Sequence, residues 1–140
     1  MSPSPHGPEG DNDFSNDPNC VALYNFENGA LTTDSKGGNT LSVGGNSPTA
    51  VMVDYKQGLA SCDFEASNNQ YWTIADADLD AGFPLKNGDA VGNISVCCWI
   101  KLTGKNEYQT FYEKGDTDKW SFTLGVSNSN LVWVLLGKDN

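Results

Sequence analysis

Apolar and polar residues alternate strictly between Ile94 and Leu102, in the segment ISVCCWIKL. In a β-strand, residues two apart share a face. One face of this segment would carry Ile94, Val96, Cys98, Ile100 and Leu102, and the other would carry Ser95, Cys97, Trp99 and Lys101. The pattern predicts a central strand that buries its apolar face against a second sheet and leaves a tryptophan among polar groups.

Shorter segments with the same kind of pattern follow one another along the chain, separated by residues that favour turns. The expected strands cover residues 20–26, 40–43, 57–65, 70–76, 94–102, 108–114, 119–126 and 131–136. The longest connection, residues 76–93, is expected to contain one helical turn around Asp78 to Ala81. No longer segment has a helical period, so the predicted fold class is all-β and antiparallel.

The first 19 residues differ from the rest in composition. They hold four of the six prolines and almost no apolar residues, so we expect a flexible polar leader or linker followed by a β-domain over residues 20–140. A secretory signal would need a basic start and an apolar run, and residues 1–19 have neither. No signal peptide is therefore expected in this chain.

The charge of the chain limits its partners. Eighteen acidic residues against eight basic ones give a net charge of −10. Binding to phosphate backbones needs a basic face, so nucleic acid is not an expected partner. No run of apolar residues is long enough to span a bilayer, so membrane insertion is not expected either. The acidity suits a soluble extracellular or virion surface, or loops that hold a hard cation.

The four cysteines, Cys20, Cys62, Cys97 and Cys98, match no zinc-binding spacing, and His6 in the leader is the only histidine. Neighbouring cysteines on opposite faces of a strand cannot readily bridge to each other. Cys98 falls on the apolar face and is expected to be a buried small hydrophobe. Reduced thiols are the main expectation, and a bridge from Cys20 or Cys62 in an oxidising compartment is the alternative.

Taken in order, several segments resemble the laminin G-like modules of the concanavalin A-like lectin/glucanase superfamily. They are LYNFENG (23–29), TDSKGGNTL (33–41), GLASCDFEASNNQYWTI (58–74), ISVCCWIKL (94–102), FYEKGD (111–116) and WSFTLGV (120–126). The resemblance implies an antiparallel jelly-roll β-sandwich. Members of the family continue beyond the LVWVLL-type strand, so we expect this chain to be the N-terminal part of such a sandwich, incomplete at its C-terminus. Exposed strand edges would then favour self-association.

The superfamily includes glycanases that use two carboxylates on one strand. In this chain only Asp63 and Glu65 lie two apart within an expected strand, and they are more simply explained as solvated residues on an exposed face. His6 lies in the leader, so a serine or cysteine nucleophile would have no partner base. We therefore expect the chain not to be an enzyme.

The resemblance also implies calcium as a cofactor. In similar modules one Ca²⁺ lies near the first strand and the Asp-Ser-x-Gly loop, so Asp34 would be the main ligand, with Glu27 or Asn39 and loop carbonyls as further ligands. The alternative for this loop is an ordinary Asx-capped turn. The acidic run Asp76–Asp80 lacks the glycine that an EF-hand requires, so a capped turn is expected there.

Sugar binding requires exposed aromatic faces for stacking and polar side chains for hydroxyl groups. The expected ligand-binding residues are Tyr71, Trp99 and Tyr108. The sequence as a whole predicts a non-catalytic carbohydrate-binding or adhesion module on an extracellular, cell or virion surface, with glycans or a cell-surface polysaccharide as partners. The alternative is a self-assembling structural protein, such as a virion or filament building block, in which the sandwich makes the subunit contacts.

Overall fold

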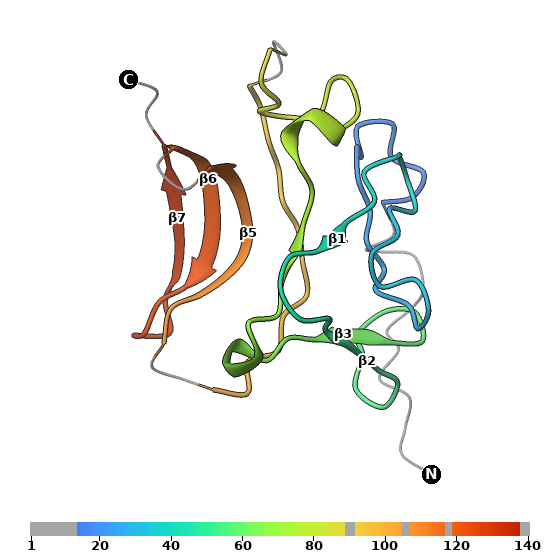
Figure 1. The fold of residues 1–140 in the computed structure, drawn as a ribbon, viewed down its shortest axis with the longest axis vertical. Helices are drawn as coiled ribbons and strands as arrows, with labels where there is room; N and C mark the ends of the chain where they lie inside the picture. The colour runs from blue at the N-terminus through green and yellow to red at the C-terminus, as the bar shows by residue number, and fades with distance from the viewer. Residues whose placement is uncertain (1–13, 89–91, 105–106, 117–118, 138–140) are drawn as a thin grey trace. The chain divides into compact units, whose positions relative to one another are not determined.

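The computed structural model describes residues 14–88, 92–104, 107–116 and 119–137 (Figure 1). The chain divides into two compact units, Met1–Asp89 and Ala90–Asn140, which are taken separately below. Among the described residues the regular structure consists of strands in small antiparallel sheets and two short 3-10 turns. The all-β prediction is confirmed at that level, while the jelly-roll sandwich stays a prediction.

The first unit contains two sheets of two strands each. Strand β1 (Ser42–Val43) pairs with β4 (Trp72–Thr73), and β2 (Thr49–Val51) pairs with β3 (Ser61–Asp63) (Figure 1). The 3-10 turns are η1 (Ala66–Asn68) and η2 (Asp76–Asp78). The strands are short because glycines and asparagines, which favour turns over extended pairing, interrupt the apolar segments.

The interior of the first unit combines apolar and polar side chains. Ala60, Leu79 and Phe83 are its buried apolar residues among those described, and Asp34 and Asn39 are buried with them. Burying polar groups is favourable only where hydrogen bonds replace those made to water. The loop between residues 34 and 39 must therefore be held by a hydrogen-bond network as well as by apolar packing.

The second unit contains one three-stranded antiparallel sheet, in the order β5 (Gln109–Asp116), β6 (Lys119–Val126) and β7 (Val132–Leu136) (Figure 1). The central strand β6 holds the buried residues Thr123 and Val126. The Tyr112 and Phe122 rings meet edge to face with their centroids 5.9 Å apart. These contacts stabilise the pairing of β5 with β6 beyond its backbone hydrogen bonds.

Alternation in the sequence located the second unit's strands well. The expected strand at 119–126 coincides with β6, and those at 108–114 and 131–136 differ from β5 and β7 by at most two residues at either end. In the first unit the expected strands at 40–43, 57–65 and 70–76 shrink to two or three paired residues each. Strand β2 was not expected, because its residues lack an alternating pattern. The expected helical turn is present slightly earlier, as η2.

Two strand predictions are wrong. Residues 92–104 and 20–26 form no strand. Alternation states which side chains share a face, but a strand also needs a neighbouring backbone to accept and donate its hydrogen bonds. The prediction that Cys98 is buried is wrong for the same reason, because without a packed sheet its thiol is exposed.

The expected leader lies mostly outside the described residues, which begin at residue 14. Residues 14–19 form hydrogen-bonded turns, with the Asp17 N–H donating to the Phe14 carbonyl and the Cys20 N–H donating to the Asp17 carbonyl. The Lys36 ammonium also donates to the Ser15 carbonyl over 2.6 Å. These contacts attach the end of the expected leader to the first unit.

Candidate functional site

The Tyr71 ring lies directly on the backbone of two glycines in the first unit. A Cβ placed on Gly44 would lie 1.9 Å from Cε2 of Tyr71, 2.4 Å from Cδ2 and 2.6 Å from Cζ. If this Cβ approached Cε2 in the plane of the ring, the two neighbouring ring carbons, Cδ2 and Cζ, would both lie farther from it than these distances. Gly44 therefore lies against the face of the Tyr71 ring. Gly45 is close to Cε1 of the same ring. We call Tyr71 together with Gly44 and Gly45 the Tyr71 platform.

Backbone contacts fix the Tyr71 platform in place. The Gly44 N–H donates to the Tyr71 carbonyl over 3.0 Å, and the Asn46 N–H donates to the Asn69 carbonyl over 3.1 Å. Next to these bonds, β1 pairs with β4 and Asn46 forms an isolated parallel bridge with Gln70. The tyrosine is nevertheless 47% exposed. The glycines therefore support one side of the ring while much of its surface stays open to solvent.

Two amide residues, Asn46 and Gln70, are the sequence neighbours of Gly45 and Tyr71 in the Tyr71 platform. Asn46 Nδ2 donates to the Asn68 carbonyl over 2.7 Å, and Gln70 Nε2 donates to the Ser47 carbonyl over 2.9 Å. Gln70 Oε1 also accepts from the Glu65 N–H over 2.7 Å. The amides are thereby oriented by the protein itself. An exposed aromatic ring with oriented amides around it can stack on an apolar face and hydrogen-bond to hydroxyl groups.

Asp34 and Asn39 form a buried network below the surface of the same unit. Asp34 Oδ1 accepts from the Leu23 and Lys36 N–H groups, each over 2.9 Å. Its Oδ2 accepts from the Asn39 backbone N–H over 3.2 Å and from Asn39 Nδ2 over 2.9 Å. Asn39 is fully buried. The bond to Lys36, two residues on, is the one that defines an Asx-turn, so the loop contains such a turn.

Asp80 joins this network from a distant part of the sequence. Its Oδ2 accepts from the Gly38 N–H over 2.7 Å and from Asn39 Nδ2 over 3.2 Å. Its own N–H donates to Asn39 Oδ1 over 2.9 Å. Asn39 thus uses both ends of its amide to connect the 34–39 loop to the segment that follows η2. Through these bonds, a polar cluster in the first unit connects two segments that lie about forty residues apart in the sequence.

The contacts of the expected calcium ligands suit an internal hydrogen-bond role better than a cation. Each Asp34 oxygen already accepts two N–H groups, and a cation would need the same lone pairs. Glu27 is held elsewhere, because both its carboxylate oxygens accept from the Leu59 N–H, at 3.0 and 3.2 Å. In the described part of the chain no three His, Cys, Asp or Glu residues gather closely enough to hold a metal ion. Calcium stays a prediction from the resemblance.

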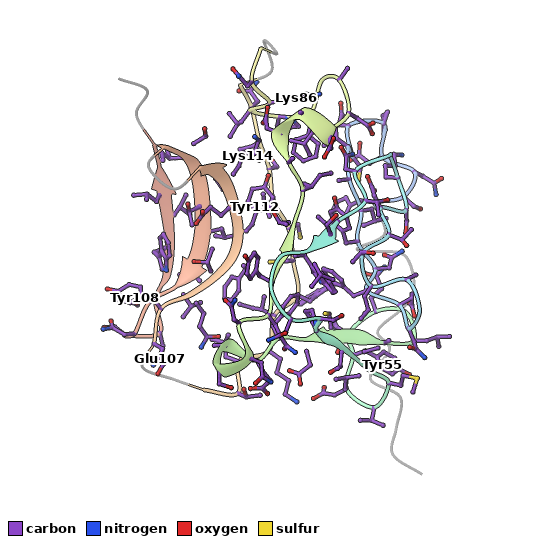
Figure 2. All side chains as sticks on the ribbon, in the orientation of Figure 1. Tyr55, Lys86, Glu107, Tyr108, Tyr112 and Lys114 are labelled. Carbon is purple, nitrogen blue, oxygen red and sulfur yellow. The ribbon has the colours of Figure 1, made fainter. Side chains whose placement is uncertain are left out.

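The other two expected ligand-binding residues, Trp99 and Tyr108, belong to the second unit, whereas Tyr71 belongs to the first. Trp99 is 58% exposed, in the segment 92–104, which forms no strand among the described residues. Tyr108 is 68% exposed and lies just before β5, beside Glu107 (Figure 2). Its ring meets Trp133 of β7 edge to face, with centroids 6.5 Å apart. Both side chains are open to solvent, but neither rests on a glycine backbone as Tyr71 does.

The carboxylate pair considered for catalysis lies on the surface. Asp63 ends β3, and Glu65 precedes η1 as its N-cap residue. Both side chains are exposed. A glycosidase needs one carboxylic acid whose pKa is raised by its surroundings. The expectation of a non-catalytic chain stays a prediction.

The four thiols are free and differ in their surroundings. Burial raises the pKa of the Cys62 thiol to about 11. At pH 8 a thiol with that pKa is ionised in about one molecule in a thousand. Cys97 is exposed. We expect iodoacetamide to modify Cys97 at least about tenfold faster than Cys62 in the native protein, because the thiolate is the reacting form and needs access.

Peptide mass spectrometry of samples quenched over time would give both rates in one experiment. In urea, where burial is lost, the two cysteines should react at similar rates, which provides the internal control. Equal rates in the native protein would contradict the burial of Cys62.

The sequence did not reveal the groups that complete the Tyr71 platform and the Asp34–Asn39 network. From the sequence, Gly44 and Gly45 had no expected role in a site, and Asp80 belonged only to the capped turn expected for the acidic run Asp76–Asp80. Adjacent glycines directly after the expected strand at 40–43 are a signal that another group approaches the backbone closely. No local signal connects Asp80 to Asn39, because they lie 41 residues apart.

Two further findings concern the chain as a whole. Its described residues include no helix with the length and apolar character needed to cross a membrane. Searches of protein-family models, of curated proteins and of solved structures return no match to this chain. The resemblance to laminin G-like modules therefore rests on the sequence segments alone.

Proposed function

We propose that this chain is a non-catalytic carbohydrate-binding module and that its first unit contacts the glycan through the Tyr71 platform. The proposal places it on an extracellular, cell or virion surface, where glycans are available as partners. The resemblance to laminin G-like modules supports the same class of function. Net charge also agrees, since a strongly acidic chain suits neutral sugars better than phosphate polymers.

The position of the Tyr71 ring against Gly44 and Gly45 is the observation that carries the proposal. A sugar ring presents C–H groups that pack on an aromatic face, and it presents hydroxyl groups at its edge that need amide or carbonyl partners. A ring that is already immobile loses little conformational entropy when a ligand stacks on it. Asn46 and Gln70 are neighbours in sequence of Gly45 and Tyr71, and their amides, oriented by bonds to backbone carbonyls, are the proposed partners of the hydroxyl groups.

Binding should depend on the Tyr71 ring and on its support. We expect Tyr71→Ala to weaken binding to a responsive polysaccharide about tenfold or more, because one stacking contact is lost. Gly44→Ala should weaken binding similarly, since a Cβ there would overlap the ring and displace it. Gly104→Ala is the matched control, because a Cβ at that position meets nothing within 4 Å.

The measurement is depletion from solution by insoluble cellulose, xylan, chitin and mannan, together with a glycan array for soluble oligosaccharides. Circular dichroism and thermal melting of each variant would show that a loss of binding is not a loss of folding. If the unsubstituted chain binds nothing in either format, the proposed function is wrong. If it binds and Tyr71→Ala binds equally well, the function stands and the site is elsewhere, with Trp99 and Tyr108 as the next positions to substitute. Repeating the assay with a chelator tests the calcium prediction.

A further inference from the structure

The two edges of the three-stranded sheet differ in how well they are protected against pairing. Along β5 the pairing with β6 is irregular between Thr110 and Tyr112 and again between Lys114 and Gly115. This edge also carries the charges of Glu113 and Lys114. Bulges and charged side chains are the features by which natural sheets prevent their edges from adding further strands.

Strand β7 has none of these protections. Its pairing with β6 runs through five consecutive residue pairs without an irregularity, from Val126↔Val132 to Phe122↔Leu136. In the described part of the chain β6 is the only strand that pairs with it. The backbone groups on its other side are therefore in no strand pairing within that part of the chain. A regular, unpaired edge is a template for another strand.

The side chains of β7 are apolar and exposed. Val132 and Leu136 are each 71% exposed and Val134 is 53% exposed, although all three lie on the strand face that packs beside Phe122 and Leu124 of β6. Leu135, on the opposite face, is also exposed. A six-residue run, LVWVLL, with high β-propensity and no charge is of the type that pairs with other strands when exposed.

We propose that β7 pairs antiparallel with β7 of a second copy of this chain, with the two-fold axis at Val134. Contacts across such an axis must be self-complementary. With Val134 opposite its own copy, Val132 faces Leu136 and Trp133 faces Leu135, so every pair is apolar and no like charges meet. The net charge of −10 opposes association in general, but none of it lies on this strand.

The contact is expected to be weak and concentration-dependent. One pair of five-residue strands buries on the order of several hundred Å², less than the roughly 1,200 Å² of the smallest stable standard interfaces. The dimer should therefore form in the micromolar range of concentration and dissociate on dilution. The inference does not depend on glycan binding. If the proposed function also holds, each dimer carries two Tyr71 platforms and gains avidity for repeating polysaccharides.

Sedimentation velocity over a concentration series is the first test. The mean mass should rise with concentration from the 15.0 kDa monomer towards twice that value. Val134→Lys should keep the chain monomeric throughout, because two ammonium groups would then face each other at the axis. Val53→Lys is the matched control, because it makes the same change of residue type away from β7. Val53 lies in the first unit and is 93% exposed. That variant should associate as the unsubstituted chain does.

Oxidative cross-linking tests the register independently of any loss of folding. With the axis at position 134, Val134→Cys brings two introduced thiols to facing positions of an antiparallel pair, within the Cα separations that a disulfide spans. Oxidation with diamide should therefore give a dimer bridged through position 134, identified by peptide mass spectrometry against the four native cysteines. Leu136→Cys should give no such bridge, because its thiols would lie four residues out of register. A chain that stays monomeric at every concentration, or a dimer that neither Val134→Lys nor Val134→Cys affects, overturns the proposal.

Discussion

Replacement of Asp34 by alanine should lower the free energy of unfolding by about 3 kcal/mol or more. The Asp34 carboxylate accepts N–H groups from Leu23, from Lys36 and from the backbone and side chain of Asn39. Alanine would leave the backbone N–H groups of Leu23, Lys36 and Asn39 without this acceptor at buried or partly buried positions. The Asn39 amide would keep its bonds to the Val21 carbonyl and to Asp80 Oδ2. A buried donor that loses its partner costs about 1–3 kcal/mol, so several donors together exceed the effect of most single substitutions.

Urea unfolding followed by tryptophan fluorescence would give this free energy. Asp78→Ala is a suitable control because Asp78 is an exposed aspartate of the same unit, in η2. It should change the free energy of unfolding by no more than about 0.5 kcal/mol. If both alanine variants unfold at the same urea concentration, the network around Asp34 does not hold the first unit together.

The contribution of Asp34 should also depend on pH. Burial raises the pKa of its carboxyl, but hydrogen bonds from backbone N–H groups and the Asn39 amide outweigh burial and hold the pKa below its ordinary value of 3.8. A carboxyl whose pKa is lower in the folded state stabilises that state fully above the ordinary value. The stabilisation is then lost as the pH falls through the folded value. The stability difference between the unsubstituted chain and Asp34→Asn should therefore be constant near neutral pH and shrink below pH 3.8.

Gly125→Ala should have the second largest effect, in the central strand of the second unit. A Cβ at Gly125 would lie 2.4 Å from the Gln109 carbonyl oxygen of β5 and 2.8 Å from the indole of Trp133 on β7. Neither neighbour can yield easily, because one is backbone and the other is a ring held between strands. The added methyl group would force β5 and β7 away from β6. Overpacking of this kind costs about 1–3 kcal/mol, and we expect a value near the upper end.

Hydrogen exchange of the β5 and β6 amides, measured together with urea unfolding, would locate this effect. Gly104→Ala is again the matched control, since its Cβ would meet no other atom within 4 Å. Exchange should accelerate in the β5–β6 ladder for Gly125→Ala and remain unchanged for Gly104→Ala. Unchanged protection in both variants would show that the three strands do not pack as tightly as described.

The agreement between sequence and structure is best where neighbours in space are also neighbours in sequence. Strands β5, β6 and β7 are separated by only a few residues in the sequence, and each pairs with the next one along the chain. The alternation of KWSFTLGV and LVWVLL was therefore enough to predict β6 and β7. ISVCCWIKL has stronger alternation than either, yet residues 94–102 form no strand within the described part of the chain. The pattern of one segment carries no information about whether another backbone lies beside it.

In the candidate site, too, the sequence predicted what depends on single residues and missed what depends on contacts between distant segments. Residue type alone identified Tyr71 as an aromatic that could contact a sugar, and Asp34 and Asn39 as oxygen-bearing residues of one loop. It could not show that Tyr71 rests on Gly44, 27 positions earlier, or that Asp80 closes the loop by bonding to Asn39. The first contact holds the Tyr71 ring against Gly44 while the ring stays exposed. The second makes Asp34 and Asn39 part of a hydrogen-bond network inside the first unit.

The sequence by itself determined the all-β class, the three strands of the second unit, the acidic charge that disfavours phosphate polymers, and the aromatic residues open to ligand. Each of these depends on composition or on the two-residue period of a strand, which are local properties. Only the tertiary structure decided which strands have partners, which carboxylate is buried and which aromatic ring is held against glycine. Those outcomes depend on segments far apart in the chain, and their pairing is set by the packing and hydrogen bonding of the whole unit.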